Sequence, residues 1–196
     1  MTDAGARTPA RGPAGDAARE RIRNGAARAV VQHGPAVSMV AIAAACGVSK
    51  ALLHYHYADR AHLLADVVER SAARLVARER AALGTAATGT AVDALWRWTS
   101  AELQRGELRA LLDLGSLREP AVRRACDRAA DARRASAAIT AGLAFAQLGL
   151  APRVPAELLA DASVAFMDGL ALDSGGSRDP RVAFDVFWLA LLSLGE

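Results

Sequence analysis

Apolar residues recur along this chain at intervals of three and four positions, and strict alternation of apolar and polar residues is absent. This period places one apolar stripe on each helix and predicts an all-α fold. In the first helix, expected over residues 16–32, the stripe consists of Ile22, Ala26, Ala29 and Val30. The sequence His33-Gly34-Pro35 is expected to end that helix.

Polar residues between the apolar stripes indicate where the next helices begin. Ser38, Ser49 and Asp59 are suited to cap helix N-termini, which predicts two short helices and a long fourth helix that reaches about Leu83. Five more helices are expected near residues 91–105, 107–117, 120–149, 155–173 and 180–194. The total is about nine helices, with an N-terminal group of three joined to a C-terminal bundle.

The composition is that of a folded protein. Hydrophobic residues make up 53% of the 196 residues and charged residues 23%, which is typical of globular chains. We expect no leader peptide, since residues 1–15 lack an apolar segment, and no membrane span, since the apolar run at 182–195 is too short. The two cysteines, Cys46 and Cys126, match no disulfide or metal spacing, so a cytoplasmic location is expected.

Charge is distributed unevenly between the two parts of the chain. Residues 1–80 contain 12 Lys and Arg against 7 Asp and Glu, whereas residues 81–196 contain 12 against 14. A basic N-terminal part on a slightly acidic body favours an anionic partner for the first part.

The segment Cys46 to Arg60, CGVSKALLHYHYADR, contains the only lysine, both tyrosines and two of the four histidines. Two short helices around a tight turn at Gly47 predict a helix-turn-helix, in which Val48 and Leu53 dock the second helix on the first. Ala43 is small where the two helices cross. The side chains expected to remain exposed on the second helix are Lys50, Ala51, Leu52, His54 and Tyr55. Such a helix suits the major groove of DNA.

The longer stretch SMVAIAAACGVSKALLHYHYADRAHLL resembles the DNA-binding domain of the TetR family of transcriptional repressors, over about residues 19–64. The resemblance implies phosphate contacts for Ser38, Lys50, His54, His56 and Arg60. It places Ala51, Leu52 and Tyr55 where base edges are read, and Ser49 begins this helix and joins the expected DNA-binding set. His54, Tyr57 and Arg60 stand where the family usually has Tyr, Phe and Lys.

The residues of this segment do not favour a metal site or a catalytic site. His54, His56 and His62 could suggest a metal site, but residues two apart on a helix point about 200° away from each other. No nucleophile elbow, phosphate-binding glycine loop or paired carboxylates with a nearby histidine appear in the sequence, so no catalytic residues are expected. Neither a cofactor nor a metal is required.

The last two helices are apolar on nearly all sides, which requires cover on all sides. We expect them to pair with a second copy as a four-helix bundle, in the manner of TetR-like proteins. The residues expected at this homodimer interface are Phe166, Gly169, Leu170, Phe187, Trp188 and Leu191. Ordinary core packing is the alternative for the aromatic members.

Polar residues within apolar surroundings, such as Thr99, Asp113 and Gln147, are typical of a small-molecule pocket. The family resemblance implies such a pocket between the fifth and eighth helices. The residues expected to line it are Trp96, Thr99, Leu103, Asp113, Leu117, Leu143, Gln147 and Phe166. Core packing is again the alternative for each one.

These observations predict a ligand-responsive repressor whose dimer binds pseudo-palindromic double-stranded DNA and is released by a small, largely apolar effector. The expected division is a flexible arm at residues 1–15, a helix-turn-helix domain at 16–62 and a ligand-binding and dimerisation domain at 63–196. A helical carrier of lipids or metabolites without sequence-specific DNA binding is the alternative function.

Overall fold

The computed structural model describes residues 13–87, 90–173 and 179–196. These residues form nine helices: α1 (Pro13–His33), α2 (Met39–Cys46), α3 (Lys50–His56), α4 (Arg60–Gly84), α5 (Ala91–Arg105), α6 (Glu107–Leu114), α7 (Pro120–Gln147), α8 (Ala156–Leu172) and α9 (Pro180–Leu192). The all-α fold and the order of its helices are confirmed. Most of the expected N-terminal arm, residues 1–12, lies outside the described residues.

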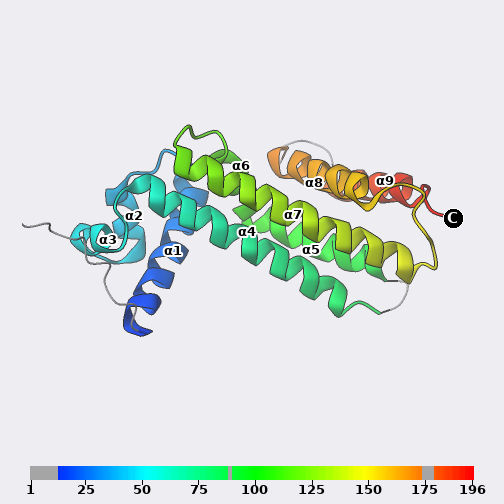
Figure 1. Ribbon diagram of the computed structural model, residues 1–196, viewed down its shortest axis with the longest axis horizontal. Helices are drawn as coiled ribbons and strands as arrows, with labels where there is room; N and C mark the ends of the chain where they lie inside the picture. The colour runs from blue at the N-terminus through cyan, green and yellow to red at the C-terminus, as the bar shows by residue number, and fades with distance from the viewer. Residues whose placement is uncertain (1–12, 88–89, 174–178) are drawn as a thin grey trace, which may run out of the picture.

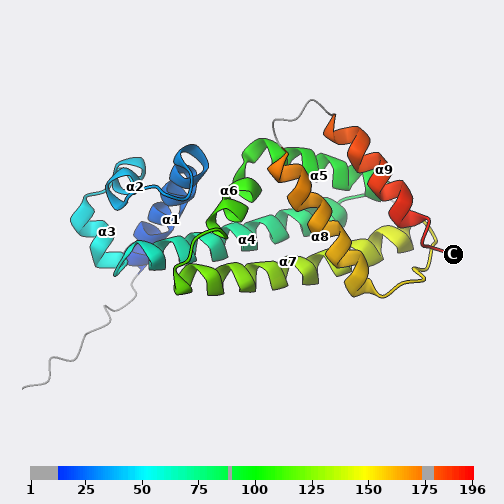
Figure 2. The ribbon, with the colours of Figure 1, turned by 90° about the horizontal axis from the view of Figure 1, so that it is seen from above.

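The helices form an elongated molecule with two ends (Figure 1). Helices α1, α2 and α3 gather at one end, and α4 and α7 run side by side away from them through the body. Figure 2 shows α8 and α9 near the opposite end, where they lie over one side of the bundle. No helix of the described part is long and apolar enough to cross a membrane.

Capping residues set the starts of three helices as predicted. The hydroxyl of Ser38 accepts a hydrogen bond from Ala41 N, and that of Ser49 accepts one from Leu52 N, at 3.2 and 3.1 Å. The Asp59 carboxylate accepts from His62 N at 2.9 Å. Each cap satisfies a backbone N–H that the first helical turn leaves without a partner.

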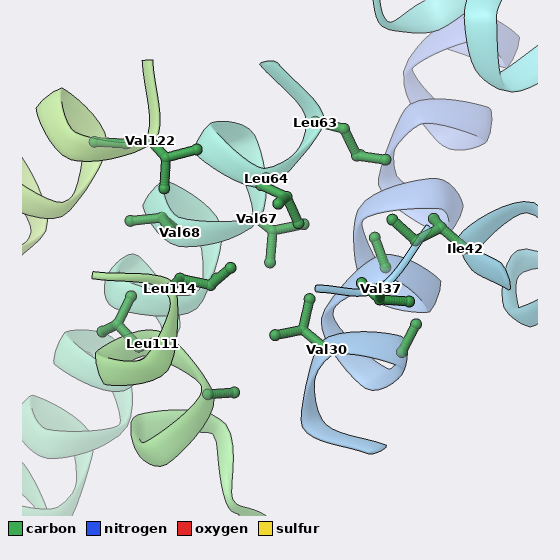
Figure 3. Close-up of a cluster of buried hydrophobic side chains, with 14 of the residues drawn as sticks. Val30, Val37, Ile42, Leu63, Leu64, Val67, Val68, Leu111, Leu114 and Val122 are labelled. Carbon is green, nitrogen blue, oxygen red and sulfur yellow. The ribbon is translucent and has the colours of Figure 1, made fainter. Parts of the chain in front are cut away.

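Two hydrophobic cores hold the helices together, and α4 contributes to both. The first core joins α1–α4 to α6 and α7 and is drawn in Figure 3, where its labelled members are Val30, Val37, Ile42, Leu63, Leu64, Val67, Val68, Leu111, Leu114 and Val122. The second core lies farther along the bundle and includes Leu83, Leu95, Phe145, Leu159, Phe184 and Trp188. The N-terminal helices therefore share a core with the body of the protein.

An ion-pair network around the buried Glu102 fixes α4 against α5 and α6. Glu102 is fully buried, and both its carboxylate oxygens accept hydrogen bonds from Arg78 at 2.6 Å. Arg105 also binds Glu102, and Arg78 reaches Glu107 at 2.9 Å. Burial alone would lower the pKa of Arg78, but its hydrogen bonds to the two carboxylates raise it. Because Glu102 has two cationic partners, its charge is compensated despite its burial.

Helices α1 and α2 cross in close contact at Gly25. A Cβ atom at this position would lie 2.9 Å from Cys46 Cα and 3.1 Å from Cys46 Cβ. The Cys46 thiol is buried there and donates to Ile22 O at 3.3 Å. The crossing distance therefore requires a residue without a side chain at position 25.

We predict that Gly25→Ala lowers the free energy of unfolding by about 1–3 kcal/mol, because the added methyl group must push the two helices apart. Urea denaturation followed by circular dichroism measures the change. Gly142→Ala is the control, since Gly142 lies exposed in α7 and a methyl group there would meet no neighbouring side chain within 4 Å. Ala at that position should raise stability by about 0.5–1 kcal/mol. Equal effects of both substitutions would contradict the close contact.

Candidate functional site

The turn between α2 and α3 has the geometry that the sequence predicts. Gly47 adopts a left-handed conformation, with φ 63° and ψ 37°, and its N–H bonds to the last turn of α2. Ala43 is buried where the helices meet, Val48 packs against the first core, and Leu53 is completely buried beneath α3. These contacts fix α3 on the molecule and determine which of its faces remains outside.

Helix α3 lies wholly within the described residues, and its outward face contains no carboxylate. Lys50, Ala51, His54 and Tyr55 are exposed, and the Tyr55 side chain is 64% accessible. Leu52 and His56 are half-buried at the edges of this face, and the His56 ring meets the Tyr55 ring edge-on at 5.2 Å. Ser38 and Ser49 lie at the starts of α2 and α3, where their hydroxyls cap the helices. Eight of the nine residues expected to contact DNA thus lie on or beside one surface.

Tyr57, next to this surface, is buried and anchors α3 from behind. Its hydroxyl donates a 2.7 Å hydrogen bond to Asp66 in α4, and the same carboxylate oxygen accepts from Arg19 Nε at 3.1 Å. The Arg19 guanidinium also lies 5.0 Å from the centre of the Tyr57 ring. Burial and the bond to Asp66 raise the pKa of Tyr57, so the hydroxyl remains a donor.

Arg60 is the ninth residue of the expected DNA-binding set, and its guanidinium binds groups within the protein. It donates to Val37 O at 2.9 Å and to Pro35 O, and it forms a 3.0 Å ion pair with Glu119 at the start of α7. This placement joins α4 to the loop after α1 and to the bundle. It gives Arg60 a structural position and leaves it few donors for a phosphate.

The histidines of this region do not converge. His54 is exposed on α3, His56 is half-buried at its end, and His62 pairs with Asp59 at 2.8 Å. Within the described ranges, no group of three His, Cys, Asp or Glu side chains is placed to hold a metal ion.

A partly open cavity lies at the centre of the C-terminal bundle, with atom-free space of about 570 Å³ that includes its opening. Helices α4 to α9 all contribute to its wall. Its polar members are Glu79, Thr99, Arg133, Thr140 and Ser163, and its aromatic members are Trp98, Phe166, Phe184, Phe187 and Trp188. The remaining wall is aliphatic, so a few polar groups stand among apolar side chains, a composition that small-molecule pockets share.

Only two of the eight residues expected at a pocket, Thr99 and Phe166, line this cavity. Of the others, Trp96 packs on Phe184 and under Arg181, Asp113 pairs with Arg109, and Leu143 is 47% exposed. Leu103 and Leu117 pack against the first core, and Gln147 is half-buried near the end of α7.

Trp98, and not the expected Trp96, lines this cavity because α5 has a charged residue on its inward face. That face runs through Leu95, Trp98, Thr99 and the fully buried Glu102. An apolar stripe on α5 that leaves the charged Glu102 at the surface contains Trp96, which is why the sequence predicts that Trp96 faces inward. The one available signal was the i, i+3 pair Glu102 and Arg105, which does not reveal burial.

Glu79 is the least expected residue of the cavity. It is only 7% exposed, and burial raises the pKa of its carboxyl group, although the nearby hydroxyl groups of Ser136 and Thr140 and the charge of Arg133 oppose the rise. No ion pair to Glu79 forms within the described part of the chain, whereas Arg133 pairs with Asp168 through both terminal nitrogens of its guanidinium group. The cavity wall therefore contains a carboxyl group whose charge is incompletely compensated.

The exposed apolar face of α8 and α9 differs from the expected one. Trp188 and Leu191 are buried in the chain's own second core, and Phe166, Leu170 and Phe187 are half-buried, so Gly169 alone of the six is exposed. The large apolar side chains on the outside are instead Leu158, Leu172, Val182, Val186 and Leu189. Leu189 is 75% exposed, the highest value among the large apolar residues described.

Two short helices joined by a left-handed glycine turn, with α3 docked by Leu53, form a helix-turn-helix, a unit that many DNA-binding proteins use. Residues 22–67 match the family model for bacterial regulatory proteins of the tetR family. This range covers most of α1, the helix-turn-helix and the first third of α4. Residues 22–67 therefore match the TetR family, and the chain has the fold of solved TetR-family regulators.

Solved structures resemble the chain over most of its length. A protein from Rhodococcus sp. RHA1, assigned as a transcriptional regulator, has a TM-score of 0.74 at 18% identity and covers 88% of this chain and 94% of its own. A TetR transcription regulator from Haloarcula marismortui has a TM-score of 0.72 at 17% identity, with coverage of 92% and 100%. A protein from Saccharomonospora viridis, assigned as a transcriptional regulator and solved in complex with choline, has a TM-score of 0.72 at 25% identity, with coverage of 92% and 99%. No curated protein sequence matches the chain.

The raised pKa of Glu79 predicts a pH-dependent stability difference. The stability that a raised-pKa carboxyl contributes is present below its unfolded-state pKa and is lost as pH rises through the folded-state pKa. Glu79→Gln removes this loss, so the variant should melt at a higher temperature than the wild type near pH 7, and the gap should close toward pH 4. Calorimetry over this pH range measures it, with Glu69→Gln on the exposed side of α4 as the control. A lower melting temperature for Glu79→Gln at neutral pH would contradict the effect of burial.

Proposed function

We propose that this protein is a ligand-responsive transcriptional regulator that acts as a repressor and binds a pseudo-palindromic operator as a homodimer. The observation that supports it best is the exposed face of α3, where Lys50 and Tyr55 stand on a helix fixed by Leu53. A carrier protein has no need of such a surface. We also propose the division at residues 16–62 and 63–196 as the functional one, although the first core crosses it.

The residues on and around α3 suit two kinds of DNA contact, with phosphates and with bases. Lys50 supplies a positive charge at the start of α3, and Ser38, Ser49, His54 and His56 supply polar groups around it, all suited to phosphate oxygens. Ala51, Leu52 and Tyr55 face the groove, where a methyl group, an apolar side chain and a phenol distinguish bases by contact with thymine methyls and polar edges. Arg60 acts as a joint between elements in this proposal and makes no essential DNA contact.

The exposed apolar residues of α8 and α9 fit an interface with a second copy. Val182, Val186 and Leu189 repeat at intervals of four and three along α9, and the small residues Ala162 and Gly169 lie on α8 beside the exposed Leu158 and Leu172. Small side chains let helices approach closely, while the larger ones fill the spaces between them. A two-fold pairing of these helices covers both stripes at once.

Helix α4 connects the cavity to the DNA-binding end. Leu75 and Glu79 line the cavity, and Leu63 and Leu64 in the same helix pack under α1 and α2. A ligand that binds the cavity better in one position of α4 shifts the spacing of the two recognition helices. A coupling of about 1–3 kcal/mol changes DNA occupancy about 5–150-fold. The choline complex of the similar Saccharomonospora viridis protein supports a small-molecule effector for this fold.

In vitro selection from a random duplex library tests the function without knowledge of the operator. The purified protein should enrich inverted repeats whose half-sites lie about 34–36 Å apart, one turn of DNA. Enrichment of no sequence at low salt would refute the proposal and favour the carrier. The same selected DNA then serves to test release by candidate effectors.

We predict that Lys50→Ala and Tyr55→Ala impair DNA binding in different ways. Loss of the lysine should weaken binding to selected and random duplexes alike and make the salt dependence shallower by about one unit. Loss of Tyr55 should weaken binding to the selected duplex alone, because it removes a base contact. Fluorescence anisotropy titrations at several salt concentrations separate the two effects. Arg97→Ala is the control and should change neither quantity, because Arg97 is exposed on α5, a helix that lies well away from α3 (Figure 2).

We predict that Leu189→Asp converts the dimer to a monomer, because a carboxylate would be buried without a partner at the two-fold interface. Light scattering at micromolar concentration should give a mass of two chains for the wild type and one for the variant. Val40→Asp places the same charge on an apolar residue of α2 that is 62% exposed at the other end of the molecule, and it should remain a dimer. A single-chain mass for the wild type would refute the interface.

A further inference from the structure

We propose that the effector is a small cation with an apolar body, such as a quaternary or tertiary ammonium compound, held between Glu79 and the aromatic wall of the cavity. This inference rests on the proposed function in taking the cavity as the effector site, and it names the chemical class that the site selects.

The charges around the cavity favour a cation. Arg133 lines the wall, but its guanidinium is bound by Asp168 through two contacts. The Arg78 and Arg105 charges nearby are likewise paired with Glu102. Glu79 is buried and forms no ion pair in the described residues. Since a buried carboxylate is costly without an opposite charge, a cationic ligand would supply the positive charge that Glu79 lacks.

The aromatic side chains of the cavity wall also favour a cationic ligand. Trp98, Phe166, Phe184, Phe187 and Trp188 reach the cavity from three helices, α5, α8 and α9. Phe166 and Phe187 stack with ring centres 4.1 Å apart, and the Trp188 ring meets Phe187 edge-on at 6.0 Å. Aromatic rings that line one small space attract a positive charge to any face they leave uncovered, and they also cover apolar ligand surface.

An anionic effector fits this wall less well. Arg133, the one basic group among the described residues of the wall, is already neutralised, and Glu79 would repel a carboxylate or phosphate. A neutral apolar ligand would fill the aliphatic and aromatic wall, but it would leave the Glu79 carboxylate incompletely compensated. Loss of the Glu79 charge should therefore weaken binding of a cation, but not binding of an anion or of a neutral ligand.

Two probes of equal shape isolate the effect of charge. Phenyltrimethylammonium and tert-butylbenzene differ only by a positive nitrogen in place of a carbon, and benzoate supplies a small aromatic anion. Binding to the full-length protein is measured by quenching of tryptophan fluorescence, because Trp98 and Trp188 line the cavity. We expect the cation to bind at least tenfold more tightly than tert-butylbenzene and to exceed benzoate. Equal or tighter binding of either competitor would overturn the inference, and this comparison requires no variant to fold.

Variants of Glu79 assign the preference to the cavity. Glu79→Gln should weaken binding of phenyltrimethylammonium about tenfold and change that of tert-butylbenzene less than twofold. Glu69→Gln removes a carboxylate from the exposed side of the same helix and should leave both unchanged. Equal losses for both probes in Glu79→Gln would overturn the role of its charge.

DNA selection with the same preparations separates this inference from the proposed function. A protein that enriches an operator but prefers tert-butylbenzene would overturn the cationic effector alone. A protein that prefers the cation but enriches no DNA would overturn the regulator and leave the cation site standing.

Discussion

Helix α4 packs against both hydrophobic cores, and the positions of the two candidate sites depend on that shared packing. Its first turns place Leu63 and Leu64 beneath the DNA-binding helices, while Leu75 and Glu79 lie in the cavity wall and Leu83 reaches the second core. A helix of 25 residues is stiff over this distance. The cavity and the recognition surface therefore cannot change their relative positions unless α4 moves or bends, which is the physical basis for coupling between them.

The helices could be predicted from the sequence because their signals are local. A period of 3.6 residues, three capping side chains and a glycine at the turn each act within a few positions, and no distant residue is needed to interpret them. The helix-turn-helix was predictable for the same reason. Leu53 is buried, Gly47 is left-handed, and Lys50 and Tyr55 are exposed, as the sequence indicates.

The cavity and the outer face were harder to predict because they depend on partners distant in the chain. Glu102 is inward only because Arg78, 24 residues away, neutralises it there. Arg60 has the charge of a phosphate contact, yet two loop carbonyls and Glu119 take up its donors. On α9 nearly every side is apolar, so sequence periodicity could not decide that Trp188 faces the core and Leu189 faces outward.

The close crossing of α1 and α2 also makes Cys46 an internal reporter of local opening. Its thiol lies against Gly25 and Ile22 O, and burial raises its pKa, so little reactive thiolate is present or accessible in the closed form. An alkylating reagent can reach it only when the two helices separate. The rate at which Cys46 is modified would therefore report how often α1 and α2 separate. A bound operator should slow this rate without contacting the cysteine.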